Sequence, residues 1–99
     1  HGSLKAVEPA QPGRVKCRLL VCTGADDPFV SRDERGAFED EMTRAGADWQ
    51  LIVYSGARHG FTNRNVDPSR SPGSAYHEPT DRRSWQAMRT LFQETMGAV

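Results

Sequence analysis

Two turns of this sequence carry side chains that can hold and transfer a proton. Residues 24–30, Gly-Ala-Asp-Asp-Pro-Phe-Val, follow an apolar run and present two carboxylates, Asp26 and Asp27. Residues 56–61, Gly-Ala-Arg-His-Gly-Phe, follow a second apolar run and present His59. A carboxylate that accepts the imidazole N–H fixes the ring tautomer and stabilises the cation formed when the other nitrogen takes a proton. These residue types therefore predict an acid–base pair.

The segments around the two turns predict how they are positioned. The short apolar run at residues 18–23 predicts a strand buried on both faces, with helices on both sides of the sheet. Ser31 and Glu34 form a capping box that predicts the start of a helix, and Gly46 predicts its end. Residues 49–54, rich in aromatic and β-branched side chains, predict a second strand. The order strand, helix, strand implies a right-handed parallel crossover, which brings the carboxyl ends of both strands side by side.

The remaining segments complete a single α/β domain over residues 1–99. Residues 1–17 predict an extended lead-in, and residues 62–80, with several prolines and little periodicity, predict a long loop. Thr80 or Asp81 predicts the N-cap of a last helix that ends near Gly97. This helix carries an apolar stripe that is expected to face the core, formed by Trp85, Met88, Leu91, Phe92, Thr95 and Met96.

Each candidate residue also has a purely structural interpretation. Asp-Asp-Pro commonly builds a turn, so Asp27 alone is a weak signal. His59, followed by a glycine just past a strand, lies where backbone can approach a ligand. The sequence contains no nucleophile elbow of the type Gly-x-Ser-x-Gly or Gly-x-Cys-x-Gly, and Ser55 and Cys22 lack that context. The histidines and cysteines also lack metal-ligand spacing, so no metal site is predicted.

The charge, the cysteines and the apolar runs of the sequence indicate which partners and surroundings to expect. The 99 residues include 13 basic and 13 acidic side chains, which cancel and give no reason to expect nucleic acid or an anionic membrane as a partner. Cys17 and Cys22 are expected on opposite faces of one strand, where they cannot form a disulfide with each other. No apolar run approaches the length of a membrane span, so the chain is expected to be soluble and cytoplasmic.

Four stretches of the sequence match a known family in their order, their spacing and their local residue sequence. They are LLVCTGADDPFV at 19–30, WQLIVY at 49–54, ARHGFTN at 57–63 and DRRSW at 81–85. On these stretches the chain resembles the C-terminal part of the dienelactone hydrolases, which belong to the α/β-hydrolase superfamily. The resemblance covers nearly the whole chain. It implies a strand-helix-strand-helix unit with parallel strands, the C-terminal portion of an α/β-hydrolase fold.

The resemblance also implies roles for individual residues. Asp27 corresponds to the triad acid, His59 to the general base and Asp26 to a neighbour of the acid. The family's Cys or Ser nucleophile and its oxyanion-hole donors belong to an upstream half, so the chain is expected to be a C-terminal fragment that is inactive alone. The complete enzyme would hydrolyse a small-molecule ester or lactone without a cofactor.

Two parallel strands and two helices leave an apolar sheet edge, so we expect a homo-oligomer or a complex with the missing N-terminal half. One alternative is a non-catalytic interaction module, or a self-associating fragment, that retains the scaffold without the chemistry. Another is that Asp27 and His59 act as a simple base on a bound molecule, with Arg58 as the only candidate to stabilise developing charge.

Overall fold

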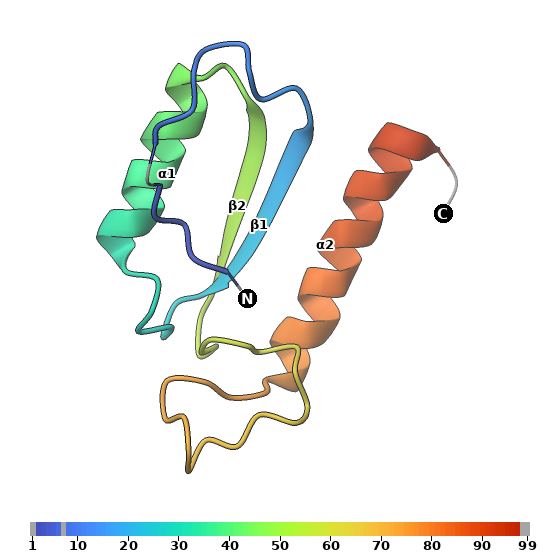
Figure 1. The fold of residues 1–99 in the computed structure, drawn as a ribbon. Helices are drawn as coiled ribbons and strands as arrows, with labels where there is room; N and C mark the ends of the chain where they lie inside the picture. The colour runs from blue at the N-terminus through green and yellow to red at the C-terminus, as the bar shows by residue number, and fades with distance from the viewer. Residues whose placement is uncertain (1, 7, 98–99) are drawn as a thin grey trace.

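The computed structural model describes residues 2–6 and 8–97, so positions 1 and 7 of the predicted lead-in lie outside the described residues. Four elements follow one another along the chain (Figure 1), and their order confirms the predicted strand-helix-strand-helix unit. They are β1 (Arg18–Gly24), α1 (Arg32–Arg44), β2 (Asp48–Tyr54) and α2 (Glu78–Met96).

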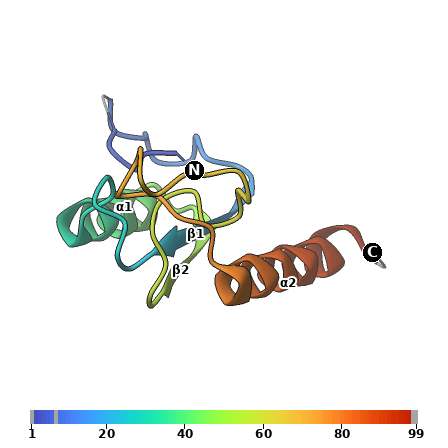
Figure 2. The same ribbon diagram turned by 90° about the horizontal axis from the view of Figure 1, so that it is seen from below.

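The two strands form a parallel pair whose register runs from Arg18 opposite Asp48 to Gly24 opposite Tyr54. This confirms the predicted parallel crossover. Helices α1 and α2 lie on opposite sides of the pair, as the two ribbon views show (Figures 1 and 2). Both strands therefore end at the same level, with a turn beyond each end.

Helix α1 begins and ends where its capping residues predict. The Ser31 side chain accepts a hydrogen bond from the Glu34 N–H at 3.1 Å, and this satisfies one of the donors left open at a helix start. Gly46, with a φ of +73°, adopts the left-handed conformation that ends many helices. Met42 is buried, and the Phe38 ring packs edge-to-face on Trp49 of β2 with the ring centroids 6.3 Å apart.

The prediction that Thr80 or Asp81 caps the last helix is wrong, because α2 already begins at Glu78 with His77 as its N-cap. Pro79 lies in the first turn, where a fixed φ and a missing N–H cost nothing. Thr80 is instead fully buried and its hydroxyl lies 2.6 Å from Nδ1 of His77. The predicted loop at 62–80 consequently ends at residue 77.

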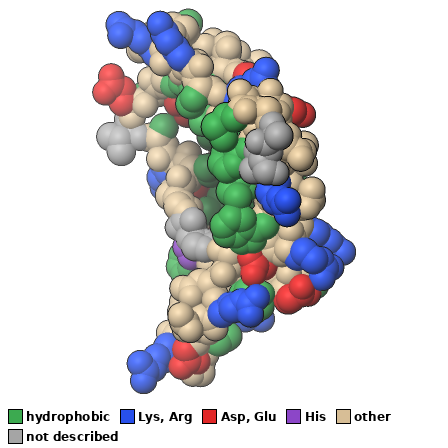
Figure 3. All heavy atoms as spheres, turned by 90° about the vertical axis from the view of Figure 1, so that its right-hand side faces the viewer, with side chains coloured by type: hydrophobic (Ala, Val, Ile, Leu, Met, Phe, Trp, Pro, Cys, Tyr) green, Lys and Arg blue, Asp and Glu red, His purple; other side chains and the backbone are tan. Residues whose placement is uncertain are grey.

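Burial is lower than the sequence predicts along β1 and α2. The apolar residues 19–22 of β1 are only partly buried, and Trp85 and Met96 of the predicted core stripe are 55% and 67% exposed. Two strands supply too little sheet to cover α2, and a groove of about 490 Å³ remains between β1 and α2. Figure 3 shows apolar side chains gathered in a band on the side of the molecule that carries α2.

The small core lies mainly around α1 and the turns that follow the strands. Its buried apolar residues are Val30, Met42, Ala45, Ala57 and Phe61. Among the described residues, no helix has the length and apolar character needed to cross a membrane.

Backbone hydrogen bonds tie the two strand-end turns together. The Ala25 N–H donates to the Tyr54 carbonyl at 2.8 Å, and the Asp26 N–H donates to the Ala57 carbonyl at 2.9 Å. Gly24 permits this approach, because a Cβ at that position would overlap the Ala57 carbonyl oxygen. A glycine is therefore required at position 24 for space.

We expect Gly24→Ala to destabilise the fold by about 1–3 kcal/mol, the usual cost of forcing an extra carbon into a tight contact. Gly36→Ala is the matched control, since a Cβ at this position of α1 meets no atom within 4 Å. It should stabilise the fold by about 0.5–1 kcal/mol. Urea unfolding followed by circular dichroism measures both variants, and equal midpoints would contradict the close approach of the two turns.

Candidate active site

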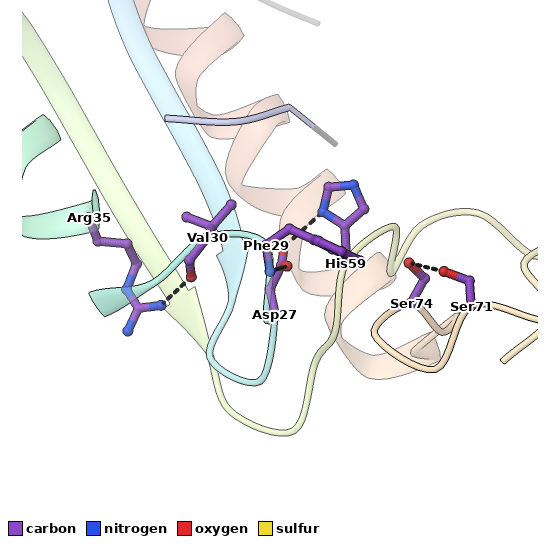
Figure 4. Close-up of polar contacts among 7 residues, drawn as sticks. All are labelled: Asp27, Phe29, Val30, Arg35, His59, Ser71 and Ser74. Atoms are coloured by element: carbon purple, nitrogen blue, oxygen red, sulfur yellow. Dashed lines mark hydrogen bonds and ion pairs between the residues drawn. The ribbon is translucent and has the colours of Figure 1, made fainter. Parts of the chain in front are cut away.

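The structure brings Asp27 and His59 into direct contact. Oδ2 of Asp27, in the turn after β1, lies 2.9 Å from Nδ1 of His59, in the turn after β2 (Figure 4). The Asp27 side chain is 5% exposed and the His59 side chain 25% exposed. A buried carboxylate thus meets an imidazole that is still accessible from outside.

The second oxygen of the Asp27 carboxylate is also held. Its Oδ1 accepts the Phe29 N–H at 2.8 Å, a short-range bond typical of an Asx-turn. Asp26 is exposed, and its backbone N–H is used to tie the two turns together. Of the two neighbouring carboxylates, Asp27 is the one that faces the imidazole.

The backbone of His59 is fixed by the long loop. Its N–H donates to the Gly73 carbonyl and its carbonyl accepts from the Ala75 N–H, each at 3.1 Å, so that residue 59 pairs with Ser74 in an isolated parallel bridge. Gly73 and Ser74 are parts of the site that the sequence does not predict. Their contribution is made by main-chain atoms, which leave no side-chain signal in the sequence.

A cavity of about 230 Å³ opens beside the pair. Asp27 and His59 line it together with residues from β1, from both turns and from the described part of the lead-in. These further residues include Ser3, Leu4, Cys22, Thr23, Val30 and Phe61. A small organic molecule next to the pair would therefore contact mainly apolar and hydroxyl-bearing walls.

The other candidate residues have structural roles or lie in unsuitable surroundings. The Arg58 guanidinium donates to the Pro72 carbonyl at 3.1 Å and so braces the loop. Ser55 is exposed in the turn after β2. Among the described residues, no group of three or more His, Cys, Asp or Glu side chains could hold a metal ion.

Both cysteines have free thiols, and they do not share a strand as predicted, because β1 begins at Arg18 and leaves Cys17 outside it. Burial raises the pKa of the Cys22 thiol above its ordinary value, although a hydrogen bond from Tyr54 opposes this. Burial, together with the nearby Cys22, also raises the pKa of Tyr54 to about 12. Cys22 is therefore a poor nucleophile near neutral pH.

Two parallel strands flanked by helices, with a carboxylate and an imidazole beyond their carboxyl ends, agree with the predicted C-terminal portion of an α/β-hydrolase fold. Residues 1–96 match the Dienelactone hydrolase family. The chain belongs to this family, as its resemblance predicts.

Two solved structures show the likeness in three dimensions. A dienelactone hydrolase-like promiscuous phosphotriesterase, P91, from metagenomic libraries is 41% identical with a TM-score of 0.78, over 83% of this chain and 34% of that one. A protein designated m3DLH is 40% identical with a TM-score of 0.77, over 87% of this chain and 38% of that one. This chain therefore spans little more than a third of either structure. A search of curated proteins found no match.

We expect iodoacetamide to modify Cys17 faster than Cys22 by about tenfold or more at pH 8. The reason is that Cys17 is exposed, whereas burial both shields Cys22 and lowers its thiolate fraction by raising its pKa. Mass spectrometry of chymotryptic peptides, which separate Cys17 from Cys22, measures the two rates, and their difference should disappear in denaturant. Equal rates in the folded protein would contradict the described environment of Cys22.

Proposed function

We propose that Asp27 and His59 are the acid and the base of a Cys/Ser-His-Asp triad that hydrolyses ester or lactone bonds. The observation that carries this proposal is the 2.9 Å contact between Asp27 Oδ2 and His59 Nδ1 beyond two parallel strands. Membership of the dienelactone hydrolase family gives the reaction class. No Gly-x-Ser-x-Gly or Gly-x-Cys-x-Gly elbow occurs in these 99 residues, so the proposal assigns the nucleophile and the oxyanion-hole donors to other polypeptide.

The proposal gives each nitrogen of His59 a separate role, and the contact of Nδ1 with Asp27 supports it. Because Nδ1 faces Asp27, Nε2 is the nitrogen that accepts the proton of the attacking thiol or hydroxyl. The Asp27 carboxylate then stabilises the imidazolium, which returns the proton to the leaving alkoxide. In the second half of the reaction, His59 deprotonates water and the acyl group is released. None of these steps requires a cofactor.

The surface beside β1 favours a partner that pairs with the free edge of this strand. Within the described residues β1 pairs only with β2, so its other edge offers unpaired backbone groups. The groove beside that strand is lined by leucines, Met88, Trp85 and Phe92. We propose that the nucleophile-bearing part of the fold covers this edge and groove, and that a second copy of the chain covers them when that part is absent.

A phosphotriester is a second candidate substrate. The 41% identical P91 is described as a promiscuous phosphotriesterase, and the same acid–base pair could activate a nucleophile toward phosphorus. The alternative of a non-catalytic interaction module is less favoured, because it gives no reason for a carboxylate that is 5% exposed to be aligned on an imidazole.

We expect hydrolysis only when the chain is joined to the nucleophile-bearing part of a dienelactone hydrolase. In that protein Asp27→Asn should lower kcat about 10⁴-fold, because it stabilises the wrong tautomer of His59, and His59→Ala should abolish measurable turnover. Asp26→Asn is the matched control and should retain activity, since Asp26 is exposed. Release of p-nitrophenol from an acetate ester and from a phosphotriester measures these effects and separates the two substrates. Unchanged activity in His59→Ala would contradict the proposal.

We expect the chain alone to self-associate through the edge of β1 and the adjoining groove. Leu91→Asp places a charge in the groove and should weaken association about tenfold or more, whereas Thr90→Asp adds the same charge on an exposed position. Sedimentation velocity over a range of concentrations measures both variants. A strictly monomeric wild-type chain that unfolds cooperatively would contradict this proposal.

A further inference from the structure

Phe29 contacts both members of the proposed acid–base pair. Its backbone N–H donates to Oδ1 of Asp27 at 2.8 Å. Its ring packs edge-to-face on the imidazole of His59, with the ring centroids 5.2 Å apart and the planes at 79°. The close-up draws Phe29 beside the direct contact of Asp27 with His59 (Figure 4). One residue therefore fixes the acid through its main chain and contacts the base through its side chain.

The position of the Phe29 ring is not explained by core packing, because the residue is 55% exposed. An exposed phenylalanine forgoes much of the stabilisation that burial would give it. Trp85 is equally exposed, but it lies on α2 and lines the groove beside β1. Phe29 differs from Trp85 in that its ring contacts the imidazole of His59.

The Phe29 ring packs against Gly73 of the long loop. A Cβ at Gly73 would lie 3.0 Å from Cε2 and 3.2 Å from Cζ of Phe29, so glycine leaves the space that the ring occupies. The Gly73 carbonyl accepts the His59 N–H at 3.1 Å. The backbone at residue 73 thus supports the aromatic ring and holds the histidine main chain at the same point.

We propose that Phe29 is a positioning residue that keeps the His59 imidazole in the orientation required by Asp27. Rotation of the imidazole about its Cβ–Cγ bond would break the Nδ1 contact with Asp27, and it would also disrupt the edge-to-face arrangement with Phe29. Aromatic pairs in this geometry favour their packed state beyond simple burial. The assignment rests on the proposed function of His59 and adds a residue that acts through it.

The direct test is the exchange rate of the His59 Nδ1 proton with water, measured by NMR on the ¹⁵N-histidine-labelled chain. Phe29→Ala removes the ring and keeps the N–H that binds Asp27, so it should accelerate exchange about two- to tenfold. Val53→Ala, which truncates an exposed apolar side chain that lines neither the groove nor the cavity beside His59, should leave the rate unchanged. If Phe29→Ala does not fold, Phe29→Leu carries the same test and should change the rate in the same direction. An unchanged rate in a folded Phe29 variant would overturn the proposal.

A second readout separates this proposal from the proposed function. In the protein joined to the nucleophile-bearing part, Phe29→Ala should lower kcat about two- to tenfold with little change in KM, because it alters the alignment of the base. A loss confined to KM would overturn the positioning role. If even the wild-type protein hydrolyses neither ester nor phosphotriester, the proposed function fails, while the proton exchange rate still decides whether Phe29 positions His59.

Discussion

The register of the two parallel strands is the constraint on which the site depends. Gly24 lies opposite Tyr54, and the turns beyond them are joined by the bonds from Ala25 to Tyr54 and from Asp26 to Ala57. A slip of one residue would move one turn along the strands by about 3.3 Å and reverse the side-chain faces. A hydrogen bond does not survive such a displacement. The contact between Asp27 and His59 is therefore a direct consequence of strand pairing.

The carboxylate of Asp27 is buried at the point where this constraint acts. A buried charge is costly unless its oxygens are hydrogen-bonded, and here one oxygen accepts the Phe29 N–H while the other meets His59. The imidazole stays more exposed than the carboxylate. This difference in exposure suits the proposed pair, in which Asp27 only orients and stabilises the imidazole while His59 exchanges protons with its surroundings.

The sequence was sufficient to predict the elements whose signals are local. The capping box at Ser31, the left-handed Gly46 and the β-rich residues 49–54 each act within a few residues, and the structure has the predicted helix and strand there. The predicted start of α2 is wrong because the polar Thr80 resembles a cap, whereas Pro79 allows the helix to begin earlier. The contact of Phe29 with His59 could not be predicted, since it depends on how a loop returns to the site.

The exposure of the α2 stripe follows from the small size of the sheet. A two-stranded sheet cannot cover a 19-residue helix, and Trp85 therefore remains exposed in the unit described here. The most direct test of the proposed triad is a crystal structure of the chain joined to the nucleophile-bearing part. We expect a Cys sulfur or Ser oxygen within hydrogen-bond reach of His59 Nε2, about 2.6–3.2 Å for an oxygen. A structure with His59 bound to Asp27 but no such atom near Nε2 would contradict the proposed triad.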